Sequence, residues 1–358
     1  MSRFPQKTKR LLIPAWRRGA LLLTLIALLL GSALDSAAAA QPLTAFGVYV
    51  KNAGQEPWRI DTLAGEVGRS PVIVSEYKQW DRPPFDVNEL NAIWGRGAVP
   101  LITWEPMTLN GAPYPLRAIA TGYYDEYISE SARQARDWGL PIMLRFAHEP
   151  NGSWYPWGIR VEGNTPRRYK RAWRHVVEIF RSEGATNVQW VWTPNVNSVD
   201  LFPFKKLYPG DAWVDWVGFD GFNWAKDGRW HSFTRVAYNT YEELAKLSSR
   251  PMIVGETGCS ERGGNKAAWV ASALRREIPR FRRIRAVVWF SEEFDDEYAG
   301  NMLDSRINSS PESLRAFQWW LRLPRYGLSR EALLNTPRRY LKGSPKAPRL
   351  PRRGYGRF

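Results

Sequence analysis

The stretch "LPIMLRFAHE" (residues 140–149) is a short, mainly apolar run that ends in a charged pair, His148 and Glu149. After a segment rich in Pro, Gly and aromatic residues comes "PRRYKRAWRHVVEIFRSEG" (166–184), whose pattern is typical of a helix. A buried strand followed by a helix is the repeating unit of a parallel sheet that is covered on both faces. The number of such units along the chain therefore decides the fold.

Seven more apolar runs rich in strand-forming residues occur, at 43–50, 71–77, 98–106, 187–195, 213–223, 250–257 and 284–294. Further helical patterns lie at 125–138, 265–278 and 310–323. Eight repeats over about 280 residues match a (β/α)8 TIM barrel in count and size. An open doubly wound sheet is disfavoured, because no Gly-rich fingerprint follows the first run. We predict a single α/β catalytic domain over 41–323.

The first forty residues read as an export signal. A basic segment is followed by the 15-residue apolar run 20–34 and then by small residues, and cleavage after Ala40 fits this pattern. The run is short for a membrane span, and an uncleaved anchor is the alternative. We therefore expect a secreted or periplasmic protein. Its single cysteine, Cys259, allows no intramolecular disulfide, so export has not led to a disulfide-stapled fold.

The formal charge of +16 is concentrated at the two ends of the chain. Residues 1–40 hold six Lys/Arg and one acid, and residues 337–358 hold eight Lys/Arg and no acid, which leaves 41–336 near +3. We expect the Pro- and Gly-containing segment 324–358 to be a largely disordered tail. It either contacts an anionic envelope polymer or membrane by electrostatics or is simply solvated. No motif suggests nucleic-acid binding.

Polar and aromatic residues gather where the predicted strands end, the face on which TIM barrels carry their active sites. Carboxylates, amides and indoles on one face are typical of carbohydrate binding, because polar groups bond hydroxyls and flat rings stack on sugars. The residues that we expect to bind substrate or support the site are Trp104, Glu105, Arg145, His148, Trp154, Asn195, Phe222, Trp224 and Trp289.

Two of the carboxylates suit glycoside hydrolysis, which needs an acid/base and, for retention of configuration, a nucleophile about 5–5.5 Å away. Glu149 and Glu256 end the fourth and seventh strands, so they can face each other across the barrel mouth. Aromatic neighbours would favour the protonated form of Glu149. Arg145, if it points inward, would favour the ionised form of Glu256.

Other chemistries find little support in the sequence. The histidines His148, His175 and His231 show no HxH or HExxH spacing, so we expect no metal and no cofactor. No GxSxG elbow is present for a Ser-His-Asp triad.

The motifs "HEPNGSWYPWG", "WTPN", "YPGDAWVDWVGFDGFNW", "IVGETG" and "VVWF" together resemble those of glycoside hydrolase family 26 over residues 43–320. That family contains β-mannanases, with some mixed-linkage glucanases and xylanases. The resemblance implies a retaining (β/α)8 enzyme with Glu149 as acid/base after His148, and Glu256 as nucleophile. It also implies sugar contacts for Trp154 and Trp289.

Two positions depart from the family pattern. Phe222 stands where the family usually has a Tyr near the nucleophile, and "TWEP" (103–106) lacks the His that mannanases carry near the third strand. Both departures leave the substrate open.

We therefore expect a monomeric endo-β-glycosidase acting on a β-1,4-linked polysaccharide. Two alternatives remain: an enzyme that trims its own cell's exopolysaccharide, and a non-catalytic polysaccharide-binding protein on the same barrel.

Overall fold

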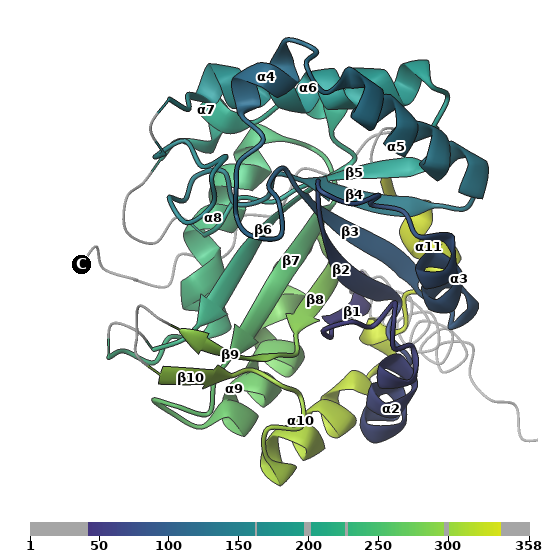
Figure 1. The fold of residues 1–358 in the computed structure, drawn as a ribbon. Helices are drawn as coiled ribbons and strands as arrows, with labels where there is room; N and C mark the ends of the chain where they lie inside the picture. Colours follow the sequence, from purple (N-terminus) through teal and green to yellow (C-terminus); the bar gives the residue numbers. More distant parts are fainter. Residues whose placement is uncertain (1–41, 162, 197–201, 226–227, 297–300, 338–358) are drawn as a thin grey trace, which may run out of the picture. The chain divides into compact units, whose positions relative to one another are not determined.

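A computed structural model describes residues 42–161, 163–196, 202–225, 228–296 and 301–337. Eight parallel strands close into a barrel in chain order, with β8 returning to pair with β1 (Figure 1). The strands are β1 (Ala45–Tyr49), β2 (Ile73–Gln79), β3 (Val99–Glu105), β4 (Ile142–Phe146), β5 (Val188–Trp192), β6 (Trp216–Asn223), β7 (Met252–Cys259) and β8 (Ile284–Phe290). Each predicted run overlaps one strand of the barrel, and the predicted (β/α)8 barrel is confirmed.

Helices lie around the barrel and connect successive strands (Figure 1). They are α2 (Trp58–Val67), α3 (Val87–Gly95), α4 (Leu116–Ala120), α5 (Asp125–Trp138), α6 (Pro166–Ser182), α7 (Phe204–Leu207), α8 (Phe233–Leu247), α9 (Lys266–Ser272) and α10 (Pro311–Leu321). The helix predicted over 265–278 is α9 followed by a π-turn at Ala273–Glu277 and a 3-10 turn at Ile278–Arg280. A short hairpin, β9 (Glu293–Asp296) and β10 (Asn301–Asp304), follows β8.

Helix α6 shows how local sequence sets these elements. Thr165 caps its first turn by accepting a hydrogen bond from the Arg168 amide, and Pro166 occupies the first turn, where no amide donor is needed. Its buried stripe faces the sheet and consists of Tyr169, Ala172, Trp173, Val176, Val177 and Phe180. The helix is therefore fixed by its start signal and by one apolar face.

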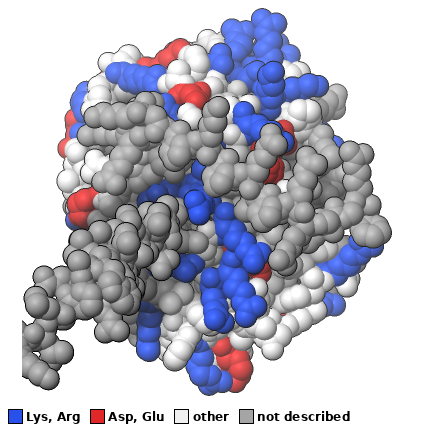
Figure 2. Space-filling view, turned by 180° about the vertical axis from the view of Figure 1, so that it is seen from behind, with Lys and Arg blue, Asp and Glu red and all other residues white. Residues whose placement is uncertain are grey.

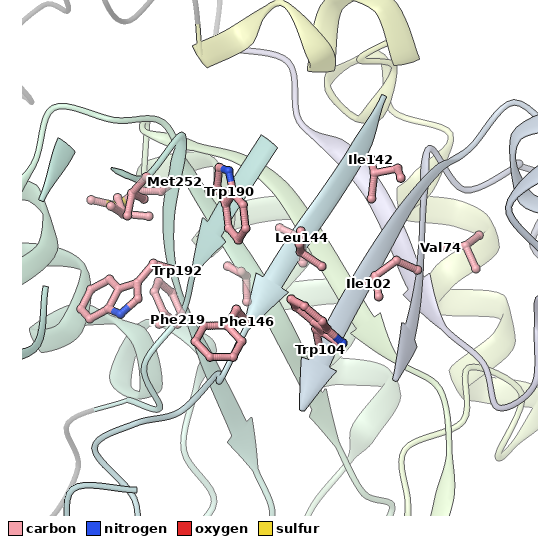
Figure 3. Close-up of a cluster of buried hydrophobic side chains, with 14 of the residues drawn as sticks. Val74, Ile102, Trp104, Ile142, Leu144, Phe146, Trp190, Trp192, Phe219 and Met252 are labelled. Atoms are coloured by element: carbon pink, nitrogen blue, oxygen red, sulfur yellow. The ribbon is translucent and has the colours of Figure 1, made fainter. Parts of the chain in front are cut away.

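The side chains of each strand alternate between two cores. One set fills the barrel interior with residues such as Leu101, Met143 and Ile253. The other set points outward and packs under the helices (Figure 3). This alternation decides which residues at the end of each strand can reach the barrel mouth.

Residues 324–337, which the sequence analysis assigned to a disordered tail, are ordered. They form a 3-10 turn at Pro324–Tyr326 and helix α11 (Arg330–Leu334), and Leu328 and Leu333 are buried in the core of the barrel interior. The Thr44 amide donates to the Arg325 carbonyl oxygen at 2.6 Å, and Gln189 Nε2 donates to the Leu334 carbonyl oxygen at 2.8 Å. Thr44 lies just before β1, and Gln189 is the second residue of β5. The segment therefore covers the amino end of the barrel. The prediction of disorder relied on basic composition and gave too little weight to these buried leucines.

The predicted export signal and the rest of the tail, 338–358, lie outside the described residues. In the part of the chain that the structure describes, no helix is long and apolar enough to cross a bilayer. Residues 41–336 carry a formal charge near +3. Figure 2 shows Lys and Arg gathered on the face opposite to that of Figure 1, with few Asp and Glu among them.

Candidate active site

A buried polar layer lies in the barrel interior above the apolar core. Its centre is Arg145 on β4, which has no solvent exposure and points inward because Leu144 and Phe146 on either side point outward. Arg145 Nη1 contacts Asp220 Oδ1 at 3.0 Å, and its Nε and Nη2 donate to Thr103 Oγ1 at 2.9 and 2.7 Å. Thr193 Oγ1 donates to Asp220 Oδ2 at 2.9 Å. The layer fixes a guanidinium directly beneath the barrel mouth.

Glu256 reaches the interior because β7 is irregular. The register with β6 shifts between Phe219 and Asp220, so that Gly255 has no partner and Glu256 pairs with Asp220. A Cβ on Gly255 would lie 2.4 Å from Asp220 Oδ1 and 2.9 Å from Arg145 Nη1, which only glycine avoids. Such bulges re-aim side chains next to active sites.

Two donors hold the Glu256 carboxylate. Arg145 Nη2 donates to Oε1 at 2.5 Å, which confirms the contact expected from the sequence. The Tyr77 hydroxyl, from β2, donates to the same oxygen. Tyr77 was not among the predicted site residues. It supplies a phenol beside Glu256 from β2, whereas Phe222 on β6 has none.

Glu149 sits in a different electrostatic setting. Its carboxylate is buried, and the hydrogen-bond donors that it meets among the described residues are neutral: Asn195 Nδ2 at 2.7 Å and Trp154 Nε1 at 2.6 Å. Burial, followed by the negative charge of Glu256, raises the pKa of Glu149 to about 7. Glu149 is therefore able to keep a proton near neutral pH, in agreement with the expectation from its aromatic surroundings.

The backbone that presents Glu149 is strained. Ala147 and Glu149 both have positive φ angles, 43° and 49°, which non-glycine residues rarely adopt. The Ala147 amide donates to the Trp104 carbonyl oxygen and the Glu149 amide to that of Thr193, so the neighbouring strands hold this conformation. Strain of this kind costs about 1–3 kcal/mol per residue and is concentrated at functional sites.

The groups around the acid are fixed in turn. The Asn195 backbone amide donates to Asn151 Oδ1, and Asn151 Nδ2 donates to the Asn195 backbone carbonyl oxygen, each at 2.9 Å. His148 Nε2 lies 3.0 Å from the Tyr155 hydroxyl and 4.0 Å from Glu256 Oε1. Burial and the charge of Arg145 lower the pKa of His148 well below its usual range, so its ring is neutral.

Both carboxylates line one cavity of about 820 Å³. Besides Glu149 and Glu256, its wall includes Tyr49, Tyr77, Glu105, Trp154, Tyr155, Asn195, Phe222, Asn223, Trp224 and Phe290. Burial raises the pKa of Glu105 to about 7, although Gln79 Nε2 donates to its carboxylate at 2.7 Å. The cavity thus presents aromatic faces and buried carboxyl groups together, a combination that suits a polyhydroxylated ligand.

Seven of the predicted site residues line this cavity: Glu105, Glu149, Trp154, Asn195, Phe222, Trp224 and Glu256. Arg145 and His148 lie directly behind the two carboxylates. Trp154 is half exposed, with its indole N–H on the acid, so its ring is open to a ligand.

Trp104 and Trp289 are not placed in the cavity. Both are buried on the outer side of their strands, Trp104 beside Ile102 and Phe146 in the core of Figure 3, and Trp289 against Phe317. Strand alternation explains this, because Thr103, Glu105 and Phe290 occupy the inward positions instead. These two tryptophans contribute to packing, and Phe290 takes the position in the cavity wall that the sequence assigned to Trp289.

Comparison with known proteins agrees with this geometry. Residues 117–271 match the family model described as Glycosyl hydrolase family 26. Endoglucanase H of Acetivibrio thermocellus is 36% identical over 264 residues, which covers 70% of this chain and 27% of that protein. A mannan endo-1,4-beta-mannosidase of Bacillus subtilis is 28% identical over 165 residues, covering 43% of this chain and 41% of that protein. The chain thus spans less than half the length of these two relatives.

Solved structures share the fold. The catalytic domain of the Bacillus sp. JAMB-750 GH26 endo-beta-1,4-mannanase superposes with a TM-score of 0.62 at 19% identity, over 82% of this chain and 89% of that one. A Cellulomonas fimi endo-beta-1,4-mannanase double mutant gives a TM-score of 0.59 at 18% identity, over 79% and 71% of the two chains.

Proposed function

This chain belongs to glycosyl hydrolase family 26, and from that premise we propose that it is a retaining endo-β-glycosidase acting on a β-1,4-linked polysaccharide. The observation that supports this most directly is the contrast between the two buried carboxylates. Glu256 contacts a guanidinium and a phenol, whereas the donors to Glu149 in the described part of the chain are neutral and its pKa is about 7. One nucleophile and one proton donor are what a retaining glycosidase requires.

The two steps follow from these environments. In the first, Glu256 attacks the anomeric carbon while Glu149 transfers its proton to the departing glycosidic oxygen, leaving a glycosyl ester on Glu256 and an ionised Glu149. In the second, Glu149 takes a proton from water, whose oxygen attacks the anomeric carbon and releases Glu256. Each carboxyl group thereby returns to its starting protonation state.

Arg145 and Tyr77 position the nucleophile, since both donate to its Oε1. Asn195 and Trp154 orient the acid, and the exposed indole face of Trp154 offers a surface on which a sugar ring next to the cleaved bond can stack.

The sugar itself is part of the proposal. The names of similar proteins cover several polymers: an endoglucanase, mannan endo-1,4-beta-mannosidases and a Beta-1,3-xylanase TXYA of a Vibrio species, 26% identical over 153 residues. We include mannan and related β-glucans as candidate substrates. Phe222 and the absence of a His in "TWEP" (103–106) motivate the second candidate, trimming of the cell's own exopolysaccharide.

Chemical rescue tests both roles at once. Glu149→Ala should lose polysaccharide hydrolysis but keep activity on aryl glycosides with good leaving groups, and azide should then yield the retained glycosyl azide. Glu256→Ala should lose hydrolysis of the same aryl glycosides, and azide, taking the place of the missing nucleophile in a single displacement of the aryl group, should yield the glycosyl azide of inverted configuration. Ser291→Ala, outside the cavity wall, is the control. Polysaccharide hydrolysis unchanged in either glutamate variant would refute the assignment, and oligosaccharide binding without turnover by the wild type would favour the non-catalytic alternative.

Export remains part of the proposal. It is supported by the basic, apolar and small-residue succession in residues 1–40. Mass spectrometry of the mature amino terminus, together with cell fractionation, tests it. A terminus at Gln41 in the periplasm or medium agrees with a cleaved signal, whereas an intact membrane-bound chain indicates the anchor.

A further inference from the structure

One end of the cavity carries hydrogen-bond donors and positive charge that the proposed reaction does not use. Arg229 and His231, which precede α8, and Arg235 on its first turn line the same cavity as the two catalytic carboxylates. The acidic residues in the described cavity wall are Glu105, Glu149 and Glu256, and they come from the ends of β3, β4 and β7. The cavity is therefore polarised, with carboxyl groups at the barrel mouth and cationic side chains beside α8.

The basic segment is held in place by packing. Trp230 covers Gly263 and Gly264, where a Cβ on Gly264 would lie 2.4 Å from the indole. The His231 amide donates to Asn223 Oδ1 at 3.0 Å, and Trp269 Nε1 donates to the His231 carbonyl oxygen at 2.7 Å. Arg229 and His231 thus project from a backbone anchored on both sides.

Asn223 adds an independent observation. It is 1% exposed, lines the cavity, and its Oδ1 already accepts the His231 amide, which fixes the orientation of the side-chain amide. Its Nδ2 is buried and has no acceptor among the described residues. A buried donor without a partner is costly, and a ligand oxygen in the cavity would satisfy it.

Trp224 completes this end of the cavity. Its ring stacks on Phe222 with centroids 4.5 Å apart and an interplanar angle of 14°. The stack holds the indole in the cavity wall, where an aromatic ring suits contact with a sugar.

The position relative to Glu149 decides which sugar this end would bind. Val196 follows Asn195, which holds the acid, and Val196 and Val236 meet over Gly221, within 2.6 and 3.0 Å of a Cβ placed there. The first turn of α8 therefore lies beside the segment that carries Asn195, the hydrogen-bond donor to Glu149. Since Glu149 protonates the leaving oxygen, sugars on this side belong to the leaving group.

We propose that this basic end, formed by Asn223, Trp224, Arg229, His231 and Arg235, is a subsite for a carboxylate-bearing sugar unit, such as a uronic acid, on the leaving-group side of the cleaved bond. The inference rests on the glycosidase function proposed above and specifies its substrate class as an acidic polysaccharide. Arginine matches a carboxylate through charge-assisted, bidentate hydrogen bonds, and a wall of donors favours an acceptor-only group.

Matched substrates test the proposal. A neutral β-1,4-linked polysaccharide that the enzyme degrades is compared with the same polymer partly oxidised at C6 to the uronate, and with the methyl ester of that oxidised polymer. We expect kcat/KM to be about five- to tenfold higher on the oxidised form, the range for one or two partly exposed ion pairs. The preference should shrink with the ester and with added salt. Mass spectrometry should find uronate enriched at the non-reducing end of new products.

Variants locate the preference. Arg235→Gln and Arg229→Gln should each reduce the ratio of the two kcat/KM values towards one, and the exposed Arg276→Gln, outside the cavity wall, should leave it unchanged. Binding of oxidised and neutral gluco-oligosaccharides to Glu149→Gln, measured calorimetrically, gives a readout that does not need turnover. Neutral polymer degraded with no preference for the oxidised form, or a preference unaffected by both arginine variants, would overturn the subsite and leave the glycosidase standing. Loss of all turnover with preferential binding of the oxidised oligosaccharide would refute the glycosidase but keep the subsite.

Discussion

Replacing Trp154 by Phe should move the alkaline limb of the pH–rate profile to higher pH. The proposed acid, Glu149, must carry its proton for the first step, and its pKa is about 7 because it is buried beside another carboxylate. Activity of the wild type should therefore fall as the pH rises through about 7. The indole N–H donates to the ionised carboxylate at 2.6 Å and so lowers this pKa. Without that donor, the proton is held more tightly.

The size of the effect follows from the contact. A hydrogen bond to a charged group contributes about 1.5–3 kcal/mol when buried, and about 1.4 kcal/mol corresponds to one pH unit. Trp154 is 51% exposed, so solvent replaces part of the lost bond. We expect the limb to move upward by about one unit. Phenylalanine keeps an aromatic ring for stacking, so the loss of substrate affinity should be smaller than with Ala.

The assay is kcat/KM against pH on a soluble polysaccharide, with Asn195→Ala as a second variant that also removes a neutral donor from Glu149. Both variants should move the alkaline limb in the same direction, whereas the acidic limb should move less. An alkaline limb that stays in place or moves to lower pH in Trp154→Phe would refute Glu149 as the titrating acid.

Three further outcomes are expected. Tyr77→Phe keeps the ring packed on Tyr49 but removes the hydroxyl from the nucleophile, so kcat/KM should fall about ten- to hundredfold with an unchanged circular dichroism spectrum; a change below twofold would contradict its positioning role. Arg145→Met leaves Asp220 buried without its cation, and urea denaturation should show a loss of about 3–5 kcal/mol, whereas less than 1 kcal/mol would argue against a structural ion pair. A chain ending at 323 loses two buried leucines, each contributing about 1.5–3 kcal/mol, and should melt at a lower temperature than a chain ending at 337.

The count of strands was predictable because each parallel strand is buried on both faces and reads as a continuous apolar run. Because both faces of each strand are apolar, the sequence does not show directly which residues point into the barrel. Trp104 and Trp289 stand near strand ends, yet they point under the helices, and Glu105 and Phe290, one position further on, reach the cavity. Counting positions along each strand in steps of two would have separated the two sets.

Other features depend on interactions that the linear sequence does not display. The irregular pairing at Gly255 turns Glu256 inward, and the exchange of hydrogen bonds between Asn151 and Asn195 joins loops 44 residues apart. Tyr77 is a further case, since nothing in "SEYKQW" (75–80) ties its hydroxyl to a carboxylate on β7. The order of residues 324–337 was missed because charge and proline content outweighed two leucines.

Arg145 makes the environments of the Glu149 and Glu256 carboxylates different. Its guanidinium is fully buried and reaches both Asp220 and Glu256, and Tyr77 donates to the same Glu256 oxygen. Glu149 meets no cation at hydrogen-bonding distance in the described structure, only an amide and an indole. Glu149, which gains less from being charged, is therefore able to keep its proton near neutral pH. The contrast thus begins four positions before the acid. Arg145 points into the barrel by strand alternation and donates to Glu256, whereas Glu149, which follows the positive φ angle at Ala147 and has one itself, accepts hydrogen bonds from Asn195 and Trp154.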